Sequence, residues 1–151
     1  RILDLGAHLD AYWRSVTSQA DVPDKLRELR GRAEALISER QYRPCLCHND
    51  LHARNILGTG DRMRFLDWEY AGVGHPFYDL ASFVRSNDLT GSQQAILLDG
   101  YGGFDPAERE QFEHECWLFD WTCALWMVVS GQYRTPSGRA AFDQLIERLT
   151  T

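Results

Sequence analysis

A chain of 151 residues, 44% of them hydrophobic, is long enough to bury one core, and we expect a single domain over residues 1–151. The net charge of −6 argues against a nucleic-acid partner, because proteins that bind the phosphate backbone are usually basic, whereas it suits metal ions and a cationic small molecule. No stretch has the pattern of a signal peptide or a membrane span, and the four cysteines lack the spacing of a zinc site, so we expect a cytoplasmic protein with reduced thiols and no membrane partner.

The first part of the chain is predicted to be helical. Apolar residues recur at helical spacing over residues 2–17, which predicts an amphipathic helix packed on the core. After a break at residues 21–24, the same spacing predicts a second helix over residues 26–40. Pro44 then ends the helical pattern, and we expect a short strand that leads into the loop at His48.

That loop carries side chains suited to phosphoryl transfer. Asn55 follows Asp50 by five residues, and Asp67 stands at the end of an apolar strand over residues 63–66, which is the spacing of a kinase catalytic loop. Asp50 would accept or orient the proton of an attacking hydroxyl, while Asn55 and Asp67 would ligate Mg²⁺, which prefers oxygen ligands. We assign Asp50 and His48 as the catalytic residues and expect His48 to brace the loop backbone rather than to titrate. A polar loop without chemistry is the alternative, since a His-x-Asp triplet alone arises by chance.

A β-hairpin is predicted directly after the loop. Residues 56–57 and 63–66 flank a turn that contains two glycines, and the paired strands would fix the separation between Asn55 and Asp67. Residues 70–76 follow as a loop rich in Gly and Pro, at the place where a protein kinase has its longer activation segment.

The remainder of the chain has helical periodicity. Asp105, Pro106 and Glu108 form a capping box at the start of a long aromatic helix, for which Gly131 is the predicted stop. The predicted helices begin at Phe77 and cover residues 92–101, 105–130 and a final stretch from residue 136. The expected fold class is therefore α+β and mostly helical, with a small β-hairpin at the active site.

Four short segments carry a resemblance to a known family. They are His48-Asn49-Asp50-Leu51-His52, Asn55-Ile56-Leu57, Leu66-Asp67-Trp68-Glu69-Tyr70-Ala71-Gly72 and Tyr78-Asp79-Leu80-Ala81. In these segments the chain resembles the C-terminal lobe of the aminoglycoside phosphotransferase and choline kinase superfamily, especially its choline, ethanolamine and thiamine kinase-like members. The resemblance implies the C-terminal lobe of a protein kinase-like fold, with transfer of the γ-phosphate of ATP to a small-molecule hydroxyl and Mg²⁺ as cofactor.

The resemblance also implies roles for further residues. Glu69 would add a carboxylate near the metals or the substrate, and Asp79 would start a helix and brace the catalytic loop from beneath. Asn49 stands where a protein kinase has Arg, and Asp67-Trp68-Glu69 replaces Asp-Phe-Gly, so the substrate is expected to be a small alcohol rather than a protein.

The parts of a kinase that grip ATP are not seen in this sequence. No glycine-rich phosphate loop follows a strand, and no Val-Ala-Ile-Lys-like strand precedes the catalytic loop. Because the chain also opens on Arg1 rather than Met, we expect the N-terminal ATP-binding lobe to be absent from this chain and to act as its partner.

An aromatic cage for a cationic acceptor is predicted from Trp117, Trp121 and Trp126 together with Tyr70, because desolvated cation–π contacts contribute on the order of 1 to 2 kcal/mol each. Similarity to choline kinases places aromatic residues at Tyr70 and Trp126, although Cys123 occupies the position of the earlier tryptophan of a pair. Trp117 and Trp121 lie four residues apart on one helical face, and core packing is the favoured alternative for that pair.

His52, two residues after Asp50, is a further candidate for substrate contact. Choline kinases tend to have Gln there and thiamine kinase-like proteins His; a plain surface histidine is the equal alternative.

The expected function is thus an ATP- and Mg²⁺-dependent kinase of a choline- or thiamine-like compound. An aminoglycoside phosphotransferase, which would grip its substrate with a carboxylate-rich surface, is the first alternative. A catalytically inactive kinase-like binding module is the second, although the presence of Asp50, Asn55 and Asp67 together speaks against it. The sequence gives no indication of the oligomeric state.

Overall fold

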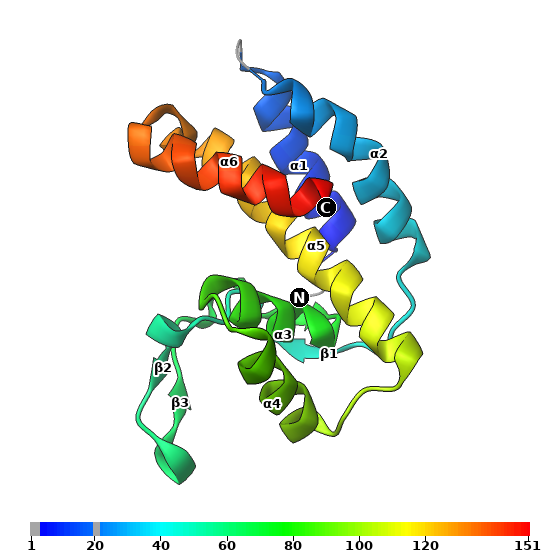
Figure 1. Ribbon diagram of the computed structural model, residues 1–151, viewed down its shortest axis with the longest axis vertical. Coiled ribbons are helices and arrows are strands. Elements are labelled where there is room, and N and C mark those ends of the chain that lie inside the picture. Colours follow the sequence, from blue (N-terminus) through cyan, green and yellow to red (C-terminus); the bar gives the residue numbers. More distant parts are fainter. Residues whose placement is uncertain (1–3, 20–21) are drawn as a thin grey trace. The chain divides into compact units, whose positions relative to one another are not determined.

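The computed structural model describes residues 4–19 and 22–151 (Figure 1). The chain forms two compact units, of which the first contains residues 42–116 and the second contains residues 4–41 and 117–151. The expectation of a single domain over residues 1–151 stays a prediction. Within the described residues, no helix combines the length and the apolar character that crossing a bilayer requires.

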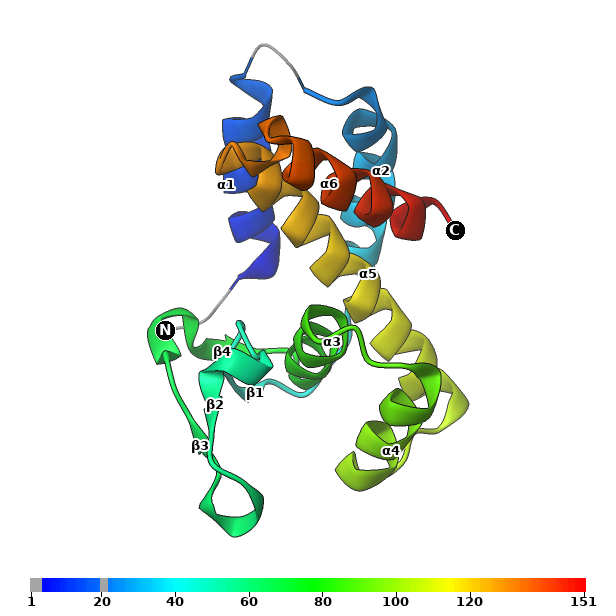
Figure 2. The ribbon, with the colours of Figure 1, turned by 60° about the vertical axis from the view of Figure 1, so that its left-hand side comes forward.

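Two short antiparallel strand pairs lie in the first unit. β2 (Ile56–Leu57) pairs with β3 (Arg64–Phe65), with Ile56 opposite Phe65, so the predicted hairpin is confirmed. Its turn requires Gly58, which has a φ of 92° and whose added Cβ would lie 2.5 Å from the carbonyl oxygen of Arg62. Figures 1 and 2 show this hairpin as a two-stranded ribbon.

The second strand pair was predicted only in part. β1 (Cys45–Cys47) is the strand expected before the loop, and it pairs with β4 (Gly72–Gly74), where the sequence predicts a loop. The loop prediction was wrong for these residues, because their glycines lie opposite the cysteines of β1 and pairing overrides their low strand propensity. Figure 2 shows the pair beside α3 (Pro76–Ser86).

Helices complete the first unit. α3 is followed by α4 (Gly91–Tyr101) and by the first part of α5 (Pro106–Val129). The capping box predicted at the start of α5 is present, since the Asp105 N–H donates to Glu108 Oε2 at 3.0 Å and the Glu108 N–H donates to Asp105 Oδ1 at 2.8 Å. The apolar part of this unit's core comes mainly from α3, with buried Phe77, Tyr78, Leu80, Ala81, Val84, Leu98 and Phe112. Polar side chains are buried there too, namely His48, Asn55, His75, Ser82 and Glu115.

The second unit is entirely helical where it is described. It contains α1 (Leu5–Thr17), α2 (Asp24–Glu39), the last part of α5, and α6 (Pro136–Thr150). These helices confirm the predicted pattern; residues 2 and 3 of the expected first helix lie outside the described residues. Gly131, two residues beyond the end of α5, has a φ of 75°, as expected of a helix stop.

Tryptophans form the centre of the second unit. Trp121 stacks on Trp117 with ring centroids 6.0 Å apart and on Trp13 at 6.1 Å. The indole N–H of Trp117 donates to the carbonyl oxygen of Leu149 at 3.0 Å, which satisfies its polar atom inside the core. This stack joins α1, α5 and α6.

Candidate functional site

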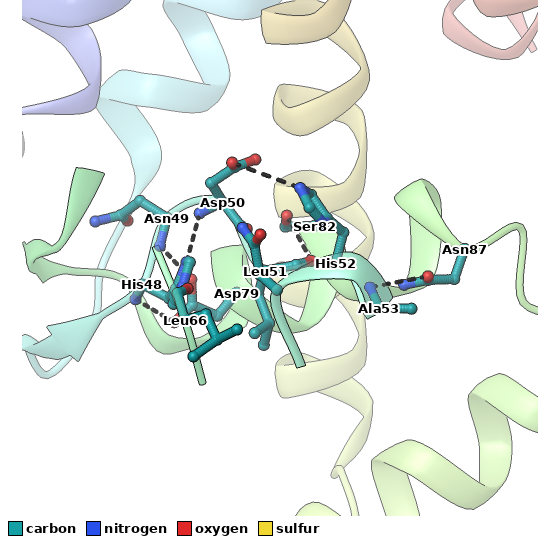
Figure 3. A network of polar contacts seen from close by, with 11 residues as sticks. His48, Asn49, Asp50, Leu51, His52, Ala53, Leu66, Asp79, Ser82 and Asn87 are labelled. Carbon is teal, nitrogen blue, oxygen red and sulfur yellow. Dashed lines mark hydrogen bonds and ion pairs between the residues drawn. The ribbon is translucent and has the colours of Figure 1, made fainter. Parts of the chain in front are cut away.

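The loop between β1 and β2 is anchored at its start by the first turn of α3 (Figure 3). The backbone N–H groups of His48 and Asn49 each donate to one carboxylate oxygen of Asp79, both at 2.7 Å. Burial raises the pKa of Asp79, and the two N–H donors oppose that rise. The bracing role that the resemblance implied for Asp79 is confirmed.

A further side chain of α3 and that of the residue directly after the helix hold the rest of the loop. Ser82 Oγ donates to the carbonyl oxygen of Leu51 at 3.0 Å, and the Ala53 N–H donates to Asn87 Oδ1 at 3.1 Å (Figure 3). Neither role was predicted from the sequence. Both are polar residues in or next to a helix whose other buried residues are apolar or aromatic. That pattern becomes informative once Asp79 is known to hold the loop.

His48 connects the loop to the end of the hairpin. Its Nδ1 accepts the N–H of Asp50 at 3.3 Å, so Nε2 carries the proton and donates to the carbonyl oxygen of Leu66 at 2.7 Å. The imidazole is buried and its ring centroid lies 4.9 Å from that of Trp68. His48 therefore braces the backbone, as predicted, and ties Asp50 to the residue before Asp67.

Asn55 also links Asp50 to Leu66, through its side chain and its backbone carbonyl. Its side-chain Nδ2 donates to the carbonyl oxygen of Asp50 at 3.0 Å, and its own carbonyl oxygen accepts the N–H of Leu66 at 2.8 Å. The side chain is buried. With Nδ2 engaged in this way, Oδ1 is the atom of the amide that can ligate a cation.

Asp67 lies on a turn that is tied to the loop at both ends. It adopts the left-handed conformation, with a φ of 62°, directly before a 3₁₀ turn at Trp68–Tyr70. His48 holds the carbonyl of Leu66 before the turn, and Asn49 Nδ2 donates to the carbonyl oxygen of Tyr70 at 3.0 Å at its end. Asp67, Glu69 and Tyr70 are exposed on this turn.

The carboxylate of Asp50 is open to solvent. Its side chain is 40% exposed, and its Oδ2 lies 3.7 Å from Nε2 of His52, whose side chain is 19% exposed. A ligand can therefore reach Asp50 without displacing the core.

The donor set fits Mg²⁺. Within the described ranges, no three His, Cys, Asp or Glu side chains converge to hold a metal by themselves. The oxygens of Asn55 and Asp67, with Glu69 on the same turn, are hard ligands of the kind Mg²⁺ prefers, and such sites are usually completed by phosphate and water oxygens. These oxygen donors are therefore of the kind that suits magnesium.

The predicted acceptor aromatics have different environments. Tyr70 is exposed on the turn next to the loop, and Trp126 is 44% exposed on α5 in the second unit. Trp121 is only 2% exposed and lies in the tryptophan stack. Its burial favours the core alternative over contact with a substrate.

Comparison with known proteins gives the family. Residues 3–112 match the model of the phosphotransferase enzyme family, APH. The chain belongs to this phosphotransferase family. LicA of Haemophilus influenzae is 37% identical over 89 residues, which are 58% of this chain and 33% of LicA. Thiamine kinase of Escherichia coli is 30% identical over 94 residues, which are 62% of this chain and 32% of that kinase.

A solved structure confirms the fold. The crystal structure of a choline/ethanolamine kinase family protein from Mesorhizobium loti superposes with a TM-score of 0.81 at 26% identity, covering 99% of this chain and 53% of that chain. The predicted α+β, mostly helical C-terminal lobe of a kinase-like fold is confirmed. The chain spans about half of this solved relative and about a third of the curated relatives.

Proposed function

We propose that this chain is the catalytic lobe of a kinase that transfers the γ-phosphate of ATP to a hydroxyl of a small, cationic compound related to choline or thiamine. One observation supports the proposal most directly, namely the closed circuit of hydrogen bonds that ties Asp50, Asn55 and the turn of Asp67 to one loop. Phosphoryl transfer depends mainly on such positioning and on neutralised phosphate charge.

In this proposal Asp50 orients the acceptor hydroxyl and takes its proton as the phosphate is transferred. Its exposed carboxylate and its fixed backbone suit that task, since a general base must be held within hydrogen-bond reach of the proton it removes. His48 and Asp79 act on the backbone of the loop and are positioning residues.

Asn55 Oδ1 and the Asp67 carboxylate would hold Mg²⁺, and Glu69 adds a third oxygen donor for the metal or the acceptor. When bound, Mg²⁺ neutralises charge on the phosphates and orients them for in-line attack. A neutral amide beside the carboxylates limits the negative charge placed near the phosphates.

The acceptor is proposed from the aromatic side chains and from the relatives. Tyr70 is exposed on the turn next to the loop, and an aromatic face suits a quaternary or thiazolium cation. The net charge of −6 attracts such a cation. The named relatives include a thiamine kinase and a choline/ethanolamine kinase family protein, which point to the same class of acceptor. The nucleotide grip would come from an N-terminal lobe.

The test is an acceptor screen on the full-length protein that carries this chain. ADP release is measured with ATP and Mg²⁺ in the presence of choline, ethanolamine, thiamine or kanamycin, for the wild type and for Asp50→Asn. We expect phosphorylation of choline or thiamine, at a rate that Asp50→Asn lowers by about 10²- to 10⁴-fold. Transfer to kanamycin alone would favour an aminoglycoside phosphotransferase, and nucleotide binding without transfer to any acceptor would favour an inactive binding module.

A further inference from the structure

His52 lies beside the proposed base in a way that the phosphotransferase assignment does not use. Its Nε2 is 3.7 Å from Oδ2 of Asp50 (Figure 3). We propose that His52 is a positioning residue for Asp50, whose Nε2–H holds one carboxylate oxygen so that the other oxygen meets the acceptor hydroxyl. This inference rests on the proposed function.

The backbone that presents His52 is fixed on both sides. The preceding carbonyl, of Leu51, accepts a hydrogen bond from Ser82, and the following N–H, of Ala53, donates to Asn87. The carbonyl oxygen of His52 itself accepts the N–H of Asn55 at 2.9 Å. The imidazole is therefore supplied from a rigid part of the loop, as a positioning group requires.

The two ring nitrogens of His52 are not equivalent. Nδ1 is buried and has no hydrogen-bond partner among the described residues, whereas Nε2 faces the carboxylate. A bare lone pair on Nε2 would repel the anionic oxygen of Asp50, and a proton there would be attracted to it. The geometry therefore selects the tautomer with the proton on Nε2.

The distance of 3.7 Å is longer than a hydrogen bond, so the contact is electrostatic in this state. Catalytic hydrogen bonds are often long before the substrate binds and shorten in the complex. A small rotation of the Asp50 side chain, which is 40% exposed, would shorten this contact to a hydrogen bond. Because Nδ1 is buried and Nε2 faces Asp50, contact with the acceptor falls to other residues.

Three substitutions separate this role from the alternatives. In full-length protein, His52→Ala and His52→Asn are expected to lower kcat by about 10- to 100-fold, with KM for acceptor and ATP changed less than about twofold, as for other residues that orient a functional group. His52→Gln should recover most of kcat, because its longer amide can place an N–H where Nε2 stood. A residue that binds the acceptor would instead raise KM in all three variants.

A double-mutant cycle gives the decisive comparison. If His52 acts through Asp50, His52→Ala should have no further effect in the Asp50→Asn background. Additive losses in the double variant, or wild-type kcat in His52→Ala, would overturn the proposal. A wild type without phosphate transfer would instead contradict the proposed function.

One readout does not depend on activity. In protein with ¹⁵N-labelled histidine, long-range proton–nitrogen spectra should show the His52 proton on Nε2, and Asp50→Asn should shift that nitrogen signal. A proton on Nδ1 alone, or a signal that Asp50→Asn leaves in place, would overturn the proposal.

Discussion

The sequence predicts functional residues both in the loop that carries Asp50 and in the aromatic stack of the second unit, and the two regions are stabilised by different contacts. The loop is held by polar groups that bind its backbone, from Asp79, Ser82 and Asn87, and its chemical side chain, Asp50, stays exposed. In the stack, the large side chains themselves are buried against each other, and Trp121 has little exposed surface.

The difference shows which residues can be changed without loss of the fold. A side chain that protrudes from a braced loop can lose its function while its backbone stays in place. A side chain that fills a core cannot be removed without a cavity. Substitutions in the two regions should therefore separate activity from stability, and the predictions below run from the largest expected effect to the smallest.

Asp50→Ala should lower kcat by about 10²- to 10⁴-fold, the usual contribution of a general base, and should change the free energy of unfolding by less than about 0.5 kcal/mol. Steady-state kinetics and urea unfolding check the two parts. Asp61→Ala, which removes an exposed carboxylate from the hairpin turn, is the control and should retain activity. Strong destabilisation by Asp50→Ala would mean that the loop is not braced independently of this side chain.

Trp121→Ala should lower the free energy of unfolding by about 3 to 5 kcal/mol, because it opens a large cavity in the stack. Trp126→Ala, on the same helix but half exposed, should change it by about 0.5 kcal/mol or less. Denaturant unfolding of both variants gives the comparison. Equal effects of the two substitutions would contradict the assignment of Trp121 to the core.

Asp79→Asn should cost about 1 to 3 kcal/mol of stability, because an amide has one oxygen for two backbone N–H groups and leaves one of them poorly matched. It should also lower kcat, since the displaced backbone belongs to the loop that carries Asp50. Thermal unfolding and kinetics are measured together, with the exposed Asp99→Asn on α4 as the control. Wild-type behaviour in both measurements would show that the loop does not depend on α3.

The last prediction concerns the chemical labelling of the two cysteines of β1, the strand that leads into the loop. Cys45 is exposed, whereas burial and the nearby Asp79 raise the pKa of Cys47 to about 12. Iodoacetamide at pH 8 should therefore label Cys45 in the native protein and label Cys47 only after unfolding, which peptide mass spectrometry can follow. Rapid labelling of native Cys47 would place this strand differently from the structure.

Local pattern in the sequence predicted much of this fold, for identifiable reasons. The hairpin at Ile56–Leu57 and Arg64–Phe65 and the capping box at Asp105 depend on neighbouring residues, so their signals are short in sequence. The brace from Asp79 came from the family resemblance and is confirmed by its two hydrogen bonds.

Long-range contacts account for what the sequence did not reveal. β4 at Gly72–Gly74 forms because it pairs with β1. Its two glycines have low strand propensity, so the sequence alone does not predict a strand there. Ser82 and Asn87 gain their roles from a loop about thirty residues earlier in the chain. For Trp121, its spacing from Trp117 on one helical face favoured core packing over an aromatic cage. The side chain is 2% exposed, which agrees with core packing.

Magnesium-dependent nucleotide binding, measured by calorimetry on the full-length protein beside phosphate transfer, tests most directly whether Asp50, Asn55 and Asp67 serve one site. We predict that Asp50→Ala binds ATP and Mg²⁺ with wild-type affinity but transfers phosphate about 10²- to 10⁴-fold more slowly, and that Asp67→Ala loses the dependence of nucleotide binding on Mg²⁺. Wild-type turnover by Asp50→Ala, or unchanged magnesium dependence in Asp67→Ala, would contradict the phosphotransfer site proposed for this loop.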